Sequence, residues 1–178
     1  PVPLKKTPRP PVLPDKTDPG REDALVYLAD VYRGPGLAGV PRGAVRRLRL
    51  FTYHFAYQGM GGLLGTVGMD GPWDIKRVLG SVPVEPDGSA LFRIPANTPI
   101  SVQPLDEEGK ALQLMRSWLT AQPGEFVSCN GCHESQSSAA VNRNTIAIRR
   151  EVSAIHPWRG PTRCFSFQRE VQPVLDRY

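Results

Sequence analysis

The stretch KRVLGSVPVEPDGSALFRI, residues 76–94, decides the fold class. Its valines between residues 78 and 84 fall on alternate positions, as they do on one face of a β-strand. The PDG sequence at residues 86–88 is typical of a turn, and the apolar run 90–94 follows it. The pattern therefore predicts a β-hairpin.

Other strand-like runs flank this stretch on both sides. We expect strands in residues 24–32, 45–58, 100–103 and 112–119, separated by turns rich in glycine and proline. In the longest run, four aromatic residues share one face and are interpreted as core: Phe51, Tyr53, Phe55 and Tyr57. Short strands without long alternating helices predict a mainly β protein, a β-sandwich with short helices around the Cys-rich segment described below.

The composition divides the chain into three parts. Residues 1–21 are rich in proline and are expected to form a linker or arm. Residues 22–165 hold the expected sandwich, and residues 166–178 are expected to form one helix, limited by Pro173. The chain carries a net charge of +5, but its arginines follow no nucleic-acid-binding motif, and no apolar run is long enough to span a membrane. We expect neither a nucleic-acid partner nor a membrane span.

The functional signal is the sequence CNGCH, residues 129–133. C-x-x-C-H is the attachment signature of a c-type haem. Cys129 and Cys132 can each form a thioether with one vinyl group of the porphyrin, and His133 is then close to the iron. The sequence predicts one covalently bound haem c, with these three residues as its ligands.

Three other interpretations of the motif were weighed. A structural disulfide, a zinc half-site and a thioredoxin-type redox pair all use C-x-x-C. Zinc requires a second pair of ligands, but the remaining cysteine, Cys164, stands alone, and no βαβ pattern surrounds the motif. Covalent haem is attached outside the cytoplasm, so we expect a periplasmic or extracellular protein.

Three stretches together resemble the middle domain of the hydrazine synthase alpha subunit and its planctomycete relatives. They are RLRLFTYHFAYQGMGGLLGTVGMDGPW at 47–73, the region 80–118 with PVEPDGSALFRIPANTP and QPLDEEGKALQLMRSW, and SCNGCHESQ at 128–136. FQREVQPVLDRY at 167–178 resembles the lead-in helix of a following cytochrome c domain. The resemblance implies a piece of a larger multi-haem protein, with other haem domains or subunits as partners.

The resemblance also implies an unusual haem site, which this sequence does not reproduce. In hydrazine synthase the iron is held by a tyrosine four residues after the motif histidine, and that histidine faces a zinc ion. The matching position here is Ser137, a poor iron ligand, and no cysteine precedes Cys129 to complete the zinc site. The hydrazine-forming site is therefore not expected, and iron ligation by His133 is the simpler prediction.

The sixth iron ligand and the function stay open between alternatives. The candidate ligands are His54, His156, Met60, Met69 and Met115, although residue by residue a role other than iron ligation is favoured. One hypothesis is an electron-transfer domain that relays electrons to neighbouring haems. A second is a catalytic haem with an open distal position, acting on small nitrogen or oxygen species, with Tyr53, His54 or Tyr57 as proton donors. A third is a non-redox binding module.

Overall fold

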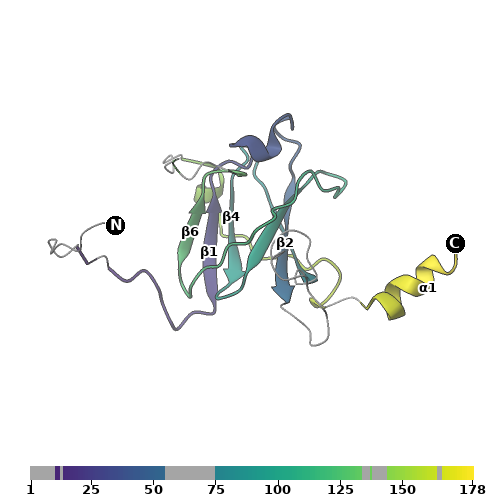
Figure 1. Cartoon of the computed structure of the whole chain (residues 1–178). Helices are drawn as coiled ribbons and strands as arrows, with labels where there is room; N and C mark the ends of the chain where they lie inside the picture. Colours follow the sequence, from purple (N-terminus) through teal and green to yellow (C-terminus); the bar gives the residue numbers. More distant parts are fainter. Residues whose placement is uncertain (1–10, 13, 55–74, 134–136, 138–143, 164–165) are drawn as a thin grey trace, which may run out of the picture.

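The computed structural model describes residues 11–12, 14–54, 75–133, 137, 144–163 and 166–178, and within them it is mainly β. One three-stranded sheet has the order β4-β1-β6 and the other β3-β2-β5. The strands are β1 (Asp23–Leu28), β2 (Arg47–His54), β3 (Ile75–Pro83), β4 (Ala90–Pro95), β5 (Ile100–Leu105) and β6 (Phe126–Cys129). All neighbouring strands are antiparallel except β1 and β6, which are parallel (Figure 1). The expectation of a mainly β chain is confirmed.

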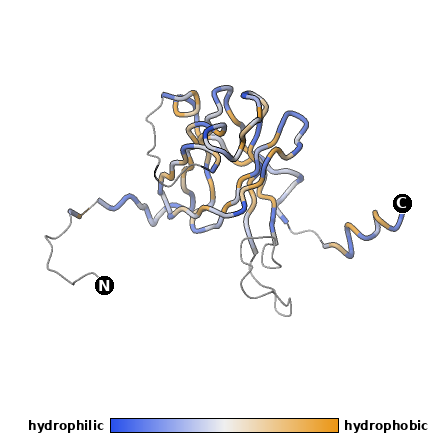
Figure 2. Tube along the Cα trace, turned by 45° about the horizontal axis from the view of Figure 1, so that its top comes forward, coloured by the Kyte–Doolittle hydropathy of each residue, from blue (hydrophilic) through white to orange (hydrophobic). Residues whose placement is uncertain are grey.

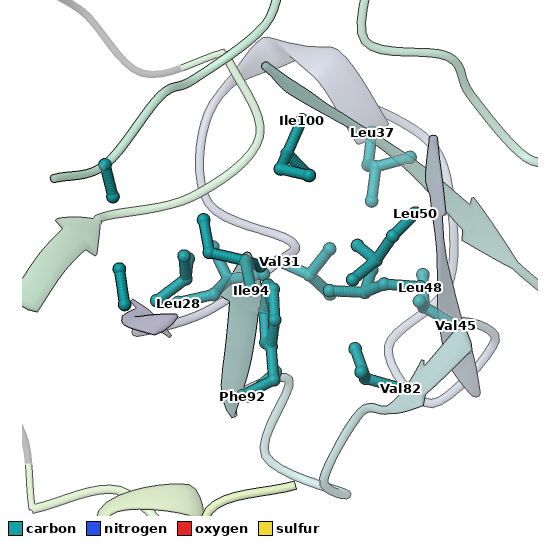
Figure 3. Close-up of a cluster of buried hydrophobic side chains, with 14 residues drawn as sticks. Leu28, Val31, Leu37, Val45, Leu48, Leu50, Val82, Phe92, Ile94 and Ile100 are labelled. Carbon is teal, nitrogen blue, oxygen red and sulfur yellow. The ribbon is translucent and has the colours of Figure 1, made fainter. Parts of the chain in front are cut away.

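The two sheets pack face to face around one core. The first sheet contributes Val26, Phe92 and Ile94, and the second contributes Leu48 and Leu50, all of which are at most 2% exposed. Figure 3 shows four of them, Phe92, Ile94, Leu48 and Leu50, within one cluster of buried side chains. Because alternate residues of a strand point to opposite faces, each strand places every second side chain in this core.

The hairpin predicted for residues 76–94 is wrong. The turn exists, and the Glu85 N–H donates to Ser89 O at 2.8 Å across it. However, β3 pairs with β2 and β4 pairs with β1, so the turn carries the chain from one sheet to the other. The turn signal was correct, but pairing was decided by strands that lie far away in the sequence.

Two other expectations differ from the structure in detail. Residues 112–119 follow the edge of β5 without forming the expected strand. Isolated bridges hold the two ends of this stretch, Leu105 with Ala111 just before it and Ile100 with Leu119. A short helix was expected to begin near Cys129, yet this residue ends β6. β6 was missed because it has only four residues and shows no clear run of apolar side chains.

The aromatic face of β2 does not point into the core. Leu48, Leu50 and Thr52 are buried on the inner face, whereas Phe51 is half-buried on the other side. Tyr53 is buried locally, with its ring 5.6 Å from that of Trp118. The interpretation of the stripe as core is therefore wrong for Phe51, whereas Tyr53 is buried as that interpretation predicts, although it packs against Trp118. The last two members of the stripe, 55 and 57, lie outside the described residues.

Helical segments are short and peripheral. They are η1 (Pro35–Leu37), η2 (Ala147–Arg149), the π-helical η3 (Phe167–Val171) and α1 (Gln172–Leu175). The last two form the helix expected near the C-terminus, which projects from the sandwich in Figures 1 and 2. None of the helices in the described parts of the chain has the length and apolar character needed to cross a membrane.

Candidate functional site

The motif CNGCH begins at the last residue of an edge strand. β6 lies parallel to β1, and this pairing places Cys129 beside Leu28. The Ala29 N–H donates to Cys129 O at 2.9 Å, which continues the pairing one residue past the strand. In Figure 1 both strands point to the upper end of the sandwich, so the motif follows at that end.

The motif packs against the segment RGPG at residues 33–36, named here the RGPG loop. The Cys132 N–H donates to Arg33 O at 2.8 Å, and the Gly36 N–H donates to Cys132 O at 3.2 Å. These two backbone hydrogen bonds hold Cys132 from both sides. The second cysteine of the motif is therefore positioned by main-chain contacts with the loop that follows β1.

Three glycines make this close packing possible. A Cβ on Gly131 would overlap Arg33 O, and one on Gly36 would lie 2.7 Å from Cys132 Sγ. Gly34 has a positive φ of 95°, and its Cβ would lie 2.5 Å from Cys132 O. Real Cβ atoms do not approach other atoms so closely, so each position requires glycine in this arrangement. The sequence predicts only a turn rich in glycine and proline at this position, and it carries no local signal for packing against the motif.

His133 has a backbone conformation that is uncommon for a residue other than glycine. Its φ is +63°, in the left-handed region, and its side chain is exposed. Such conformations are enriched at functional positions, where the surroundings hold them. The conformation presents the imidazole to solvent directly after the second cysteine.

The chemistry of these side chains fits a covalently attached haem. Cys129 and Cys132 are half-buried residues, and both pack against the hydrophobic core. A thioether requires an accessible sulfur, and an axial ligand requires an imidazole that can approach the iron. Within the described part of the chain, no cluster of three or more His, Cys, Asp or Glu side chains could hold a bare metal ion.

His54 lies at the other end of the sandwich from the motif. It is the last residue of β2, where its Cα partner is Ile75. Figure 1 shows β2 pointing to the lower end, whereas β6 points to the upper end. The structure does not bring His54 beside His133.

His156 lies at the other side of the sandwich. Its N–H and C=O both pair with Ser81 on the outer edge of β3, at 2.9 Å each, and the preceding Ser153 pairs with Phe92 of β4. Strands β4 and β1 therefore stand between this segment and β6. With about 4.8 Å between neighbouring strands, Ser153 is roughly 14 Å from β6. The side chain of His156 is exposed there.

The remaining candidates are also dispersed. Met115 is half-buried beside β5, where its N–H donates to Val102 O at 3.1 Å. Ser137 is exposed, and Tyr53 lies in the part of β2 that leads to the lower end of the sandwich. Met60, Met69, Tyr57 and Cys164 lie outside the described residues.

After the motif, the chain returns to the sandwich at a firmly bonded segment. Tyr27 and Thr145 share a hydrogen bond of 2.9 Å between their hydroxyl groups. The Ile146 N–H donates to Asp87 Oδ2 at 2.8 Å, and the Ala147 N–H donates to Ser89 Oγ at 3.1 Å. We name residues 145–147 the return segment. The motif and the return segment are thus both attached to the first sheet, the motif through β6 and the return segment through Tyr27 of β1.

The fold and the motif together define the class: a two-sheet β-sandwich domain that presents a C-x-x-C-H turn at its surface. The chain belongs to the family described as the hydrazine synthase alpha subunit middle domain, whose family model matches residues 43–134. This range contains β2 to β6 and the whole motif. No match was found among curated proteins.

A solved structure shares the fold. The chain is similar to a structure titled Kuenenia stuttgartiensis hydrazine synthase, with a TM-score of 0.69 and 16% sequence identity. The match covers 88% of this chain but only 29% of the solved one. The similarity therefore establishes the architecture of the domain, and the activity of the larger protein is a separate question.

Proposed function

We propose that this chain is a c-type haem-binding redox domain that relays electrons to neighbouring haem domains of a larger, periplasmic protein. The observation that carries the proposal is the C-x-x-C-H turn, with half-buried thiols and an exposed histidine at the end of an edge strand. Cys129 and Cys132 hold the haem through thioethers, and His133 serves as an axial ligand. The haem supplies one-electron redox chemistry when bound.

The protein's own contribution is the rigid placement of these ligands. The RGPG loop holds Cys132 through two backbone hydrogen bonds, and β1 holds Cys129. The exposed position of His133 leaves one side of the turn open to a flat ligand and to a partner that exchanges electrons with it. Membership in a family named for an alpha subunit supports the presence of partner subunits.

The test is the intact mass of the denatured protein after maturation in a periplasm with a haem-attachment system. We expect the polypeptide mass increased by one haem, and we expect this increase to disappear in the double variant Cys129→Ala, Cys132→Ala. The control is Cys164→Ser, which removes the cysteine outside the motif and should keep the haem. A wild-type mass equal to that of the bare polypeptide would refute the proposal.

The axial ligand is tested by the visible spectrum of the loaded protein. Replacement of His133 by Ala should shift the Soret band, and replacement by Asn should do the same while keeping a residue that tolerates positive φ. Ser137→Ala should leave the spectrum unchanged, because a serine hydroxyl is a poor iron ligand. A spectrum that is unaltered in both His133 variants would mean that another residue holds the iron.

A second candidate function is a catalytic haem with an open distal position. The observation that favours it is the dispersal of His54 and His156 to the far end and the far side of the sandwich. Rapid binding of carbon monoxide to the reduced protein, or of cyanide to the oxidised protein, would support an open position. Absence of binding would support a six-coordinate haem and electron relay.

A further inference from the structure

A group of arginines and a tryptophan lies on the outer face of the second sheet, away from the motif. Arg47 and Arg49 alternate with the buried Leu48 and Leu50, so both arginines point away from the core. Trp158, which is 47% exposed, follows the segment that pairs with β3. We name Arg47, Arg49 and Trp158 the arginine–tryptophan patch.

The patch lines two hollows in the surface. The larger, of about 250 Å³, is lined by both arginines and Trp158 together with the main chain near Gly80 and Gly109. The smaller, of about 110 Å³, lies along residues 158–163 and shares Trp158 with the first. Trp158 therefore forms a wall between two adjoining hollows on an open sheet face.

The two arginines have no carboxylate partner among the described residues. Arg47 Nη2 donates to Glu107 O at 3.5 Å, and Arg49 Nη1 donates to Gln103 Oε1 at 3.3 Å, both long bonds to neutral acceptors. Glu108 also lines the larger hollow, but its carboxylate is paired with Lys110 at 2.8 Å. Most guanidinium N–H groups of Arg47 and Arg49 thus remain available to an external anion.

Trp158 orients one of these guanidinium groups. The Cζ atom of Arg49 lies 5.5 Å from the centre of the Trp158 ring, within range of a cation–π interaction. A ring contact of this kind leaves the N–H groups at the guanidinium edge free to bind a carboxylate in a bidentate manner. Because Arg49 is already restrained by Trp158 and Gln103, less side-chain entropy is lost when it binds.

We propose that the arginine–tryptophan patch is a docking site for an acidic segment of a partner protein, with Asp or Glu carboxylates bound by Arg47 and Arg49. Charge complementarity supports an acidic partner, since Arg47 and Arg49 lie on the same face of β2 and neither forms an ion pair with a carboxylate of the described residues. Tryptophan and arginine are the residues that most often carry the affinity of protein interfaces. An open face with two adjoining hollows fits a polypeptide better than a single small anion.

The probe is a fluorescein-labelled peptide of alternating glutamate and alanine, titrated with the whole 178-residue chain at low salt. We compare two double variants that remove the same charge: Arg47→Gln with Arg49→Gln in the patch, and Arg46→Gln with Arg116→Gln outside it. Both control side chains are exposed. We expect about tenfold weaker binding for the patch variant and less than about twofold for the control.

A further variant separates specific docking from loss of charge or of folding. Arg49→Lys keeps the charge but loses the bidentate geometry and the planar contact with Trp158, and it should weaken binding about fivefold. Equal weakening by both double variants would mean that only the general positive charge attracts the peptide, and this would overturn the proposal. Displacement of the peptide by millimolar inorganic phosphate at matched ionic strength would identify a small-anion site instead of a docking site. Undetectable binding of the peptide would also overturn the proposal.

Discussion

Gly131 lies between the two cysteines of the motif, at a position where C-x-x-C-H places no requirement on the residue type. In this fold the requirement for glycine comes from outside the motif, because a Cβ at position 131 would overlap the carbonyl oxygen of Arg33. No φ restriction applies at Gly131, so the demand for glycine here is steric. Contact with the RGPG loop is therefore the reason that position 131 requires glycine.

Gly131→Ala should destabilise the protein by about 1–3 kcal/mol, because the added methyl group overlaps backbone that cannot move aside without breaking the hydrogen bond from Cys132 to Arg33. The measurement is the free energy of unfolding in urea. Gly20→Ala is the control, since its nearest neighbour is the side chain of Asp18 at 3.3 Å, which can rotate away. Equal stability of the two variants would show that the motif and the RGPG loop are not in contact.

At the scale of secondary-structure elements, the turn between β3 and β4 also fastens the return segment. Asp87 Oδ1 accepts hydrogen bonds from the Ser89 N–H at 3.1 Å and the Ser89 hydroxyl at 2.6 Å, and Oδ2 accepts the Ile146 N–H. Burial alone would raise the pKa of Asp87, but these hydrogen bonds outweigh it and hold the pKa below the usual value of 3.8. One carboxylate thus joins the turn before β4 to the return segment.

Asp87→Asn should lower the free energy of unfolding by about 1–3 kcal/mol near neutral pH, because charge-assisted hydrogen bonds are lost. A carboxyl whose pKa is lower in the folded state stabilises the fold above its unfolded pKa, and this contribution disappears as the pH falls through the folded pKa. The difference between wild type and variant should therefore shrink below about pH 4. Asp176→Asn, on the C-terminal helix, is the charge-matched control; a difference that stays constant with pH would contradict this role of Asp87.

At the scale of the whole molecule, both sheets depend on one shared core. Phe92 on β4 is 1% exposed and belongs to the same cluster as Leu50 on β2. The turn at residues 85–89 joins β3 to β4 without forming a ladder between the sheets, and residues 153–156 pair with β4 at one end and with β3 at the other. The two sheets are therefore expected to unfold together.

Phe92→Ala should destabilise the domain by about 3–5 kcal/mol through lost burial and the cavity that remains. The unfolding should stay a single transition when it is followed by circular dichroism and by tryptophan fluorescence. Ile148→Ala, at a position that is 49% exposed, should change the stability by less than about 0.5 kcal/mol. Two separate transitions in wild-type protein would show that the sheets fold independently.

The local sequence determined part of the secondary structure of this protein and the residue types of its candidate site. Alternating valines and turn residues identified β3, β4 and the turn between them, because side-chain period and backbone preferences are properties of a few neighbouring residues. The C-x-x-C-H motif is likewise a local signal, since both thiols and the imidazole lie within five consecutive residues, CNGCH at 129–133. The match of the family model to residues 43–134 agrees with the resemblance seen in the sequence.

Only the tertiary structure decided which strands pair and which residues surround the motif. β4 pairs with β1 instead of β3. The pairing depends on how the two sheets bury a common core, and residues distant in the sequence contribute to that core. The same packing gives Gly34, Gly36 and Gly131 their roles and moves His54 to the opposite end of the sandwich from His133. Contacts between distant segments leave no periodic signal in a single sequence, so they become visible only when the chain is folded.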